Sequence, residues 1–70
     1  MKQRIRELLH AMPFQPFLIR TVDGREYRVE HPDCVLAGSE RPNIYFEDAD
    51  GSLHTISSLL VTSVFVLANA

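Results

Sequence analysis

The sequence of 70 residues contains a single cysteine, Cys34, and no tryptophan. An intramolecular disulfide is therefore impossible. A chain of this size forms one domain, here residues 1–70, and buries only about 60% of the surface of its unfolded state. Because such a small core gives marginal stability and no disulfide supports it, we expect self-association to supply further stability.

The sequence also lacks an excess of basic residues, since its net charge is −2 at pH 7. Nucleic-acid binding driven by bulk electrostatics is disfavoured, because phosphate neutralisation needs a basic excess, although a local basic patch stays open. No apolar run reaches the roughly 18 residues that span a bilayer. The charged N-terminus has no apolar signal-peptide core. We therefore expect a soluble, cytoplasmic protein without a membrane partner.

One helix is predicted near the N-terminus, over residues 2–12. Four apolar residues at the spacing i, i+3, i+4 and i+7 define one face of it: Ile5, Leu8, Leu9 and Met12. This spacing is typical of an amphipathic helix that packs on an apolar surface. Pro13 ends the predicted helix, because proline lacks the N–H donor and restricts the residue before it.

Residues 14–67 are predicted to form antiparallel β structure. The pairs Asp23-Gly24 and Asp50-Gly51 each separate two runs with strand character, and an Asp-Gly pair favours a tight two-residue hairpin turn. Six strands are expected, at residues 14–22, 25–30, 34–37, 43–48, 53–56 and 61–67. A single helical turn is expected at residues 57–60, before the last strand.

Residues 13–33 contain the pattern P-F-x-P-F-x-I-x-x-x-D-G-R-x-x-x-V-x-H-P-D. This pattern is similar to that of a family of short, uncharacterised bacterial proteins, which implies a compact bacterial domain and no particular activity. The order of helix, hairpin strands, tight turn and last strand resembles the small SH3-like barrels, the Sm-like fold in particular. The predicted class is mainly β with an N-terminal helix (α+β), as an antiparallel five- to six-stranded barrel or bent sheet.

The Sm-like resemblance implies a ring that binds RNA. Bacterial Sm-like RNA chaperones carry a Tyr-Lys-His motif just before the last strand, where this sequence keeps His54 but has neither Tyr nor Lys. An RNA-binding role would instead require a ring that gathers the basic residues of each protomer on one face. The candidate contacts are Lys2, Arg4, Arg6 and Arg25.

Four residues are candidates for catalysis or metal binding: His31, Asp33, Cys34 and His54. A Cys–His pair forms a thiolate nucleophile only if the two side chains meet. A turn role for Asp33 and a buried apolar role for Cys34 are favoured over a metal or catalytic role for these residues. Residues 48–51 lack the other ligands and the helices of an EF-hand. We predict a non-catalytic protein without metal or cofactor, with a small metal- or Cys/His-dependent enzyme as an alternative.

The remaining polar and aromatic residues are predicted to be structural. Arg20 and Arg28 are expected to form ion pairs with nearby glutamates on the outer face of the first hairpin. Tyr45 and Phe46 are adjacent in a strand and so point to opposite faces. One of them is expected in the core, and the other is a candidate for an exposed interface contact.

The last predicted strand is the strongest indication of an interface. Residues 59–67 carry no charge, and strict alternation puts Val61 and Phe65 on one face and Val64 and Val66 on the other. Both faces are apolar, so a monomer covers only one of them unless the helix covers the second. An unprotected strand of this kind invites pairing with another chain. The predicted interface residues are Val61, Val64, Phe65, Val66 and Leu67.

We therefore predict a homo-oligomer that pairs through this strand or packs through its face, or that takes a protein partner there. The predicted function is a non-catalytic, self-associating interaction module of unknown pathway. The ring-forming RNA binder and the small enzyme are the two alternatives.

Overall fold

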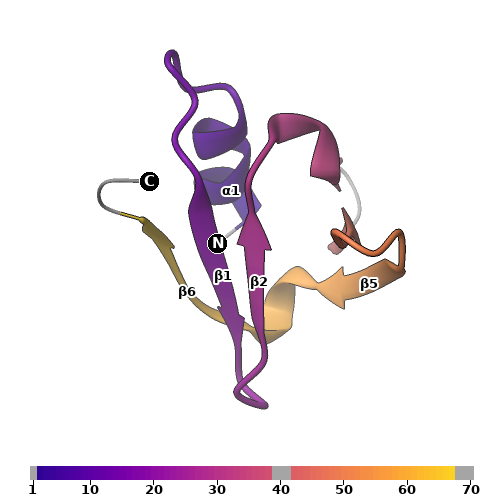
Figure 1. The fold of residues 1–70 in the computed structure, drawn as a ribbon. Coiled ribbons are helices and arrows are strands. Elements are labelled where there is room, and N and C mark those ends of the chain that lie inside the picture. The colour runs from indigo at the N-terminus through magenta and orange to yellow at the C-terminus, as the bar shows by residue number, and fades with distance from the viewer. Residues whose placement is uncertain (1, 39–41, 68–70) are drawn as a thin grey trace.

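The computed structural model describes residues 2–38 and 42–67. Within them the elements follow the order α1 (Lys2–Leu9), β1 (Phe17–Thr21), β2 (Glu26–Val29), η1 (Pro32–Cys34), β3 (Val35–Ala37), β4 (Asn43–Glu47), β5 (Leu53–Ser57), η2 (Ser58–Leu60) and β6 (Val61–Val66), where η marks a 3-10 helix (Figure 1). The strands form two antiparallel sheets, in the orders β2-β1-β6 and β3-β4-β5. The predicted class, mainly β with an N-terminal helix, is confirmed. No strand ladder joins the sheets into a closed barrel in the part of the chain described.

The helix is shorter than the predicted span of residues 2–12. It ends at Leu9, and the chain leaves it through a turn in which the His10 N–H donates to Arg6 O at 3.2 Å. Ile5 and Leu8 are buried as predicted, whereas Met12 is exposed and does not belong to the apolar face. The reason is Pro13, which excludes Met12 from the helical region and so unwinds the last predicted turn.

Both Asp-Gly pairs form hairpin turns of the same design. In the first, the Gly24 N–H donates to Thr21 O at 3.0 Å; in the second, the Gly51 N–H donates to Asp48 O at 3.0 Å. Each turn is one residue longer than the two-residue turn predicted. The paired strand ends are Thr21 and Arg25 in the first hairpin and Asp48 and Ser52 in the second, so residues 22–24 and 49–51 form the turns. Gly24 and Gly51 have φ angles of 85° and 89°, a left-handed conformation that favours glycine because it lacks a Cβ.

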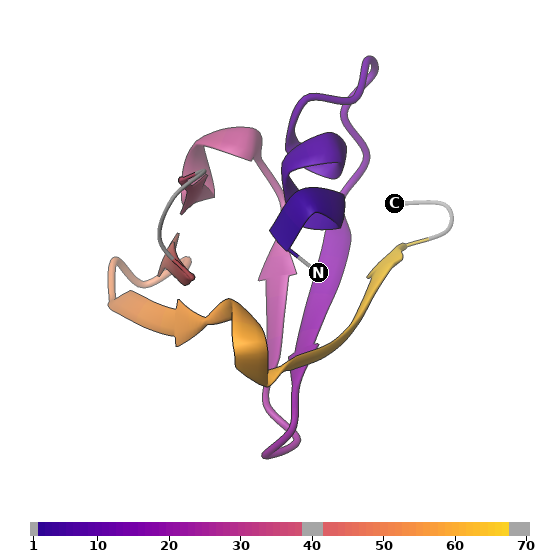
Figure 2. The same ribbon diagram turned by 180° about the vertical axis from the view of Figure 1, so that it is seen from behind.

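The hydrophobic core lies between the two sheets and is closed by α1. Residues from the helix and from both sheets form one buried cluster: Ile5, Leu8, Phe17, Ile19, Val29, Val35, Ile44, Phe46, Ile56 and Val61. In β1 the buried residues alternate as predicted, with Phe17, Ile19 and Thr21 inward. Figure 2 shows α1 lying in front of the β1–β2 hairpin, with the β5–η2–β6 segment crossing the hairpin's lower half. The core therefore uses one face of each sheet.

Strand β6 contains a bulge that the sequence did not predict. Arg20 faces Ser63 whereas Thr21 faces Val61, so Thr62 is an extra residue in the ladder. The Thr62 hydroxyl donates to Arg20 O at 3.2 Å and so holds the bulge against β1. The strict alternation predicted for this strand is therefore wrong. Val61 is buried on the same side as the half-buried Val64 and Val66, because a bulge reverses the facing of the residues that follow it.

Shortening a core side chain should test the packing between the sheets. Ile19 is fully buried, so we expect Ile19→Val to lower the free energy of unfolding by about 1 kcal/mol and Ile19→Ala by about 3 kcal/mol. Leu53→Ala should change it by less than about 0.5 kcal/mol, because Leu53 is exposed. Urea denaturation followed by circular dichroism measures all three. Equal effects at Ile19 and Leu53 would contradict the position of the core.

Candidate functional site

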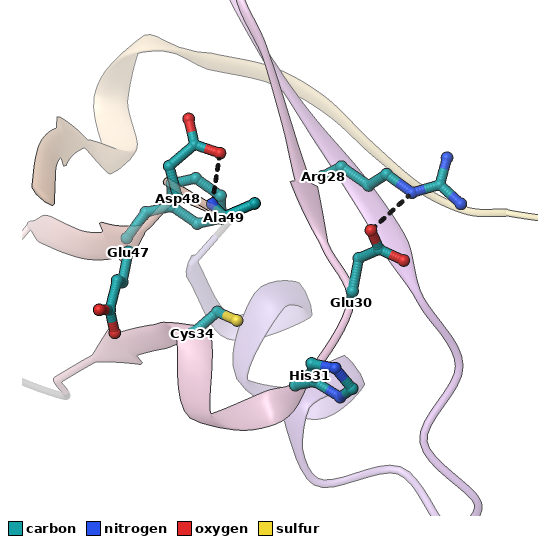
Figure 3. Close-up of a pocket in the computed structure, with 8 residues that line it drawn as sticks. Arg28, Glu30, His31, Cys34, Glu47, Asp48 and Ala49 are labelled. Atoms are coloured by element: carbon teal, nitrogen blue, oxygen red, sulfur yellow. Dashed lines mark hydrogen bonds and ion pairs between the residues drawn. The ribbon is translucent and has the colours of Figure 1, made fainter. Parts of the chain in front are cut away.

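Two hollows adjoin the end of β4. The larger, of about 490 Å³, lies between the end of β2 and the β4–β5 turn, and the smaller, of about 280 Å³, lies against β3, β4 and β5. Three residues line both hollows: Cys34, Phe46 and Glu47. Figure 3 shows the larger hollow, with Arg28 and Glu30 on one wall and Asp48 and Ala49 on the facing wall. The two hollows therefore lie on either side of these three residues.

The walls of the larger hollow carry charges of both signs. Arg28 Nε lies 3.5 Å from Glu30 Oε2, so the one arginine of this hollow already has an acidic partner. Glu47 and Asp48 add two further carboxylates. Asp48 Oδ1 accepts a hydrogen bond from the Ala49 N–H at 2.8 Å, which orients this carboxylate across the turn. The hollow is therefore acidic overall.

The four candidate residues for catalysis are divided between these hollows, and Cys34 is the member of the four that lines both. His31 and Cys34 line the larger hollow, and Asp33, Cys34 and His54 line the smaller one. The Cys34 sulfur points into the larger hollow (Figure 3). No hydrogen bond joins this thiol to a histidine among the residues described. In the same part of the chain, no three His, Cys, Asp or Glu side chains are close enough together to hold a metal ion.

His54 belongs to a cluster of three rings rather than to a catalytic pair. Its ring centroid lies 5.5 Å from that of Tyr27 and 6.0 Å from that of Phe46, and the last two rings are 5.4 Å apart. Edge-to-face contacts at such distances stabilise packed aromatic side chains. His54 Nε2 lies 3.6 Å from Asp48 Oδ2, which makes an ion pair only when the imidazole is protonated. The ring cluster joins β2 of one sheet to β4 and β5 of the other.

The β4–β5 turn beside the larger hollow is held by the Asp50 carboxylate. Asp50 Oδ1 accepts hydrogen bonds from the Ser52 hydroxyl and from the Ser52 N–H, the latter at 2.9 Å. These two bonds, the hydroxyl first, lower the pKa of Asp50 below its ordinary value of 3.8. In the β1–β2 turn, Asp23 accepts from the Thr21 hydroxyl and the Arg25 N–H, and its pKa is lowered in the same way.

The five predicted interface residues divide between two environments. Val61 is buried, and Val64, Val66 and Leu67 are partly buried. Phe65 is exposed on the outer face of β6, where the Arg20 guanidinium lies 5.3 Å from the ring centroid. Phe65 is therefore the predicted interface residue whose side chain is presented outward, because the bulge at Thr62 turns the valines toward the core.

The four predicted nucleic-acid contacts lie in two places. Lys2, Arg4 and Arg6 belong to α1, whereas Arg25 lies at the tip of the β1–β2 hairpin, at the far end of the molecule from α1 (Figures 1 and 2). Arg4 pairs with Glu7 at 3.6 Å, and Arg25 pairs with Asp23 at 3.3 Å. One protomer therefore does not bring these residues together on a single surface.

Of the two cross-strand ion pairs predicted for the first hairpin, the Arg20 pair is present: Arg20 Nε donates to Glu26 Oε2 at 2.9 Å across β1 and β2. Arg28 pairs instead with Glu30, two residues further along the chain and just beyond the end of β2. The predicted split of Tyr45 and Phe46 is present. Phe46 is buried and Tyr45 is exposed.

Sequence reasoning missed two exposed leucines beside Tyr45, namely Leu36 of β3 and Leu53 of β5. The register would have located Leu53, because it lies an odd number of residues from the inward-facing Ile56 and so faces outward.

Removing the Ser52 hydroxyl tests the contribution of its hydrogen bond to the Asp50 carboxylate in the β4–β5 turn. In Ser52→Ala we expect the pKa of Asp50 to rise toward 3.8, because the largest cause of its depression is lost. A carboxyl group whose pKa is lower in the folded state stabilises the fold at pH values above its pKa in the unfolded state. That stability is lost as the pH falls through its pKa in the folded state. The variant should therefore lose less stability than the wild type on acidification below about pH 4.

The measurement is a carboxyl ¹³C NMR titration, combined with urea unfolding at each pH. Asp23 is the internal control, since its own turn is unchanged and the pKa of Asp23 should stay lowered. An Asp50 titration that is identical in wild type and variant would contradict the assigned cause.

In the residues described, no helix has the length and apolar character to cross a membrane. Comparisons of the chain with protein-family models, with curated proteins and with solved structures find no match.

Proposed function

We propose that this protein is a non-catalytic interaction module that self-associates through the exposed edge of β6. The observation that carries the proposal is the chemistry of that edge. β6 is an outer strand of its sheet, and Val61–Val66 contains neither a charged residue nor a proline. Edge strands of natural proteins are usually protected by such residues, by being short or by a bulge. The bulge at Thr62 lies near the start of β6, and the ladder from Ser63 to Val66 is regular, so this stretch is the part of the edge that is free to pair.

The other outer strands of the two sheets support this choice. β2, the opposite edge of the same sheet, carries Glu26 and Arg28, and β3 is only three residues long. Both features discourage pairing with a second chain. β5 is an uncharged edge of five residues, so it is the second available partner for β6. Pairing of β6 with β6 of another copy closes a dimer, whereas pairing with β5 of another copy produces a ring or a longer array.

Side-chain contacts on the outer face would reinforce this pairing. Phe65 points outward beside Leu18, which it faces directly in the β1–β6 ladder. A second strand added at the edge would lie about 4.8 Å from β6 and cover part of the Phe65 ring. Main-chain hydrogen bonds would then supply the affinity and the aromatic contact would favour one register.

We also propose that the two sheets are the halves of a small SH3-like barrel of Sm-like layout. Three features support this: β6 pairs with β1, strands that follow each other in sequence pair within each sheet (β1 with β2, β3 with β4, and β4 with β5), and a single 3-10 turn at η2 separates β5 from β6. The RNA-binding ring is the weaker alternative, because Arg4 and Arg25 are each paired with a carboxylate and Arg25 lies far from α1. The small enzyme is weaker still, since the Cys34 thiol has no hydrogen-bonded histidine in the part described.

The variant Phe65→Lys should abolish self-association. A lysine on an edge strand opposes pairing with a like strand, because its charge would be desolvated or would face its own copy. We expect wild-type protein at micromolar concentration to have the mass of an oligomer and Phe65→Lys to have the mass of a monomer. Native mass spectrometry and sedimentation velocity measure this.

Leu59→Lys is the matched control, because Leu59 is an exposed leucine of η2 outside the β6 ladder, and it should keep the wild-type mass. A monomeric wild type would refute the proposal. A dimer would indicate β6–β6 pairing, and a ring of five to seven copies would indicate β6–β5 pairing. In the second case, salt-sensitive binding of labelled oligo(U) becomes the test of the RNA alternative.

A further inference from the structure

The outer faces of the two sheets differ in their chemistry. The face of β2-β1-β6 carries the Arg20–Glu26 ion pair and Arg28, as expected of a solvated surface. The face of β3-β4-β5 instead exposes three large apolar side chains. They are Leu36, Tyr45 and Leu53, exposed by 67%, 42% and 80%. Single exposed apolar residues are ordinary, but a contiguous group is typical of an interaction site.

The strand register makes these three residues contiguous. Leu36 of β3 faces Tyr45 of β4 directly, and Leu53 of β5 faces Glu47, two residues further along β4. The three side chains therefore form a diagonal stripe across all three strands, which we call the apolar stripe. The smaller hollow, of about 280 Å³, is lined by this stripe together with Asp33 and Glu47.

Among the residues described, the formally charged side chains near the apolar stripe are carboxylates. Every lysine and arginine of the described ranges lies at or before Arg28 in the sequence. The sheet β3-β4-β5, the η1 turn before it and the β4–β5 turn carry Asp33, Glu47, Asp48 and Asp50, and their one histidine, His54, lies 3.6 Å from Asp48. Glu47 lies between the two hollows and lines both. An apolar surface bordered by carboxylates is complementary to apolar side chains flanked by cations.

The dimensions favour an extended peptide over a small molecule. Three strands about 4.8 Å apart make the stripe about 10 Å wide, which is the length of about three extended residues. Two apolar side chains at alternate positions of such a segment face the same way. Both would therefore contact the stripe. The long side chain of a neighbouring lysine or arginine, whose Cβ points away from the surface, would curve back to Glu47 or Asp33 at the border of the stripe.

We propose that the outer face of β3-β4-β5 is a docking surface for a basic, apolar peptide segment of a protein partner. The partner places alternate aliphatic or aromatic side chains on Leu36, Tyr45 and Leu53 and a flanking lysine or arginine beside Glu47. This surface belongs to a different sheet from the β6 edge, so its occupation is independent of self-association by β6–β6 pairing. In the β6–β5 mode, the added strand would lie beside Leu53 at the margin of the surface.

The probe is the acetylated and amidated pentapeptide Lys-Leu-Lys-Leu-Lys, titrated into ¹⁵N-labelled protein and followed by NMR. We expect saturable shifts of the β3, β4 and β5 amides with a Kd of about 1 mM or lower. The matched peptides Glu-Leu-Glu-Leu-Glu and Lys-Ser-Lys-Ser-Lys remove the positive charge and the apolar side chains respectively. Neither should bind measurably, because the first cannot pair with the carboxylates and the second cannot bury apolar side chains on the stripe.

Two variants of the surface and two controls locate the binding. Leu53→Ser should weaken binding about tenfold, through lost apolar burial, and Glu47→Lys about fivefold, through charge reversal. Leu59→Ser changes an equally exposed leucine, 82% exposed, on η2, and Glu7→Lys makes the same charge change on α1. Both controls should bind as the wild type does, and unchanged dispersion of the amide spectra verifies that every variant is folded.

Three outcomes would overturn the proposal. The first is equal binding, or no binding, of all three peptides. The second is a set of shifts that maps to η2 or β6 and is insensitive to Leu53→Ser. The third is a concentration-dependent change of the same amides in the absence of peptide, abolished by Leu53→Ser together with a fall in mass, which would identify the occupant as a second copy of this chain.

Discussion

The packing of the two sheets against each other is the interaction on which the rest of this structure depends. Ile19 from the first sheet and Ile44 from the second are both completely buried in the same cluster. A chain of 70 residues has enough apolar side chains for one core of this kind and no more. Each sheet therefore uses one face for folding, and its other face is left for solvent or for another molecule. The helix α1 closes the core and does not cover either outer face.

This constraint explains why the outer faces of the two sheets are where binding is to be sought. Side chains that do not pack in the core are not constrained by folding, so they can contribute to solubility or to binding. On the first sheet they form ion pairs such as Arg20–Glu26, each worth little in stability but effective in keeping the surface hydrated. On the second sheet, Leu36 and Leu53 are exposed without any such partners. A single exposed leucine such as Leu59 is ordinary, but Leu36 and Leu53 flank the exposed Tyr45 in one group, which is the arrangement that an interaction explains.

Local patterns in the sequence were sufficient to predict most of the fold. The alternation of Phe17, Ile19 and Thr21 identified the buried face of β1, and the Asp-Gly pairs located both hairpin turns, because each signal depends on neighbouring residues only. The bulge at Thr62 was not predictable, since it depends on which β1 residue faces it across the ladder. Sequence reasoning therefore placed Val61 and Phe65 together, although they lie on opposite sides of β6.

The candidate site was predicted less well, and for the same physical reason. His31, Cys34 and His54 were grouped by residue type, but whether side chains of two different turns meet depends on the packing between the sheets. That packing places His54 in a ring cluster with Tyr27 and Phe46 instead.

The separation of the β6 edge from the apolar stripe has a further consequence for the two proposals. Self-association through β6 would leave one apolar stripe exposed on each copy, so that a partner with several basic, apolar segments would bind an oligomer with avidity that a monomer cannot provide.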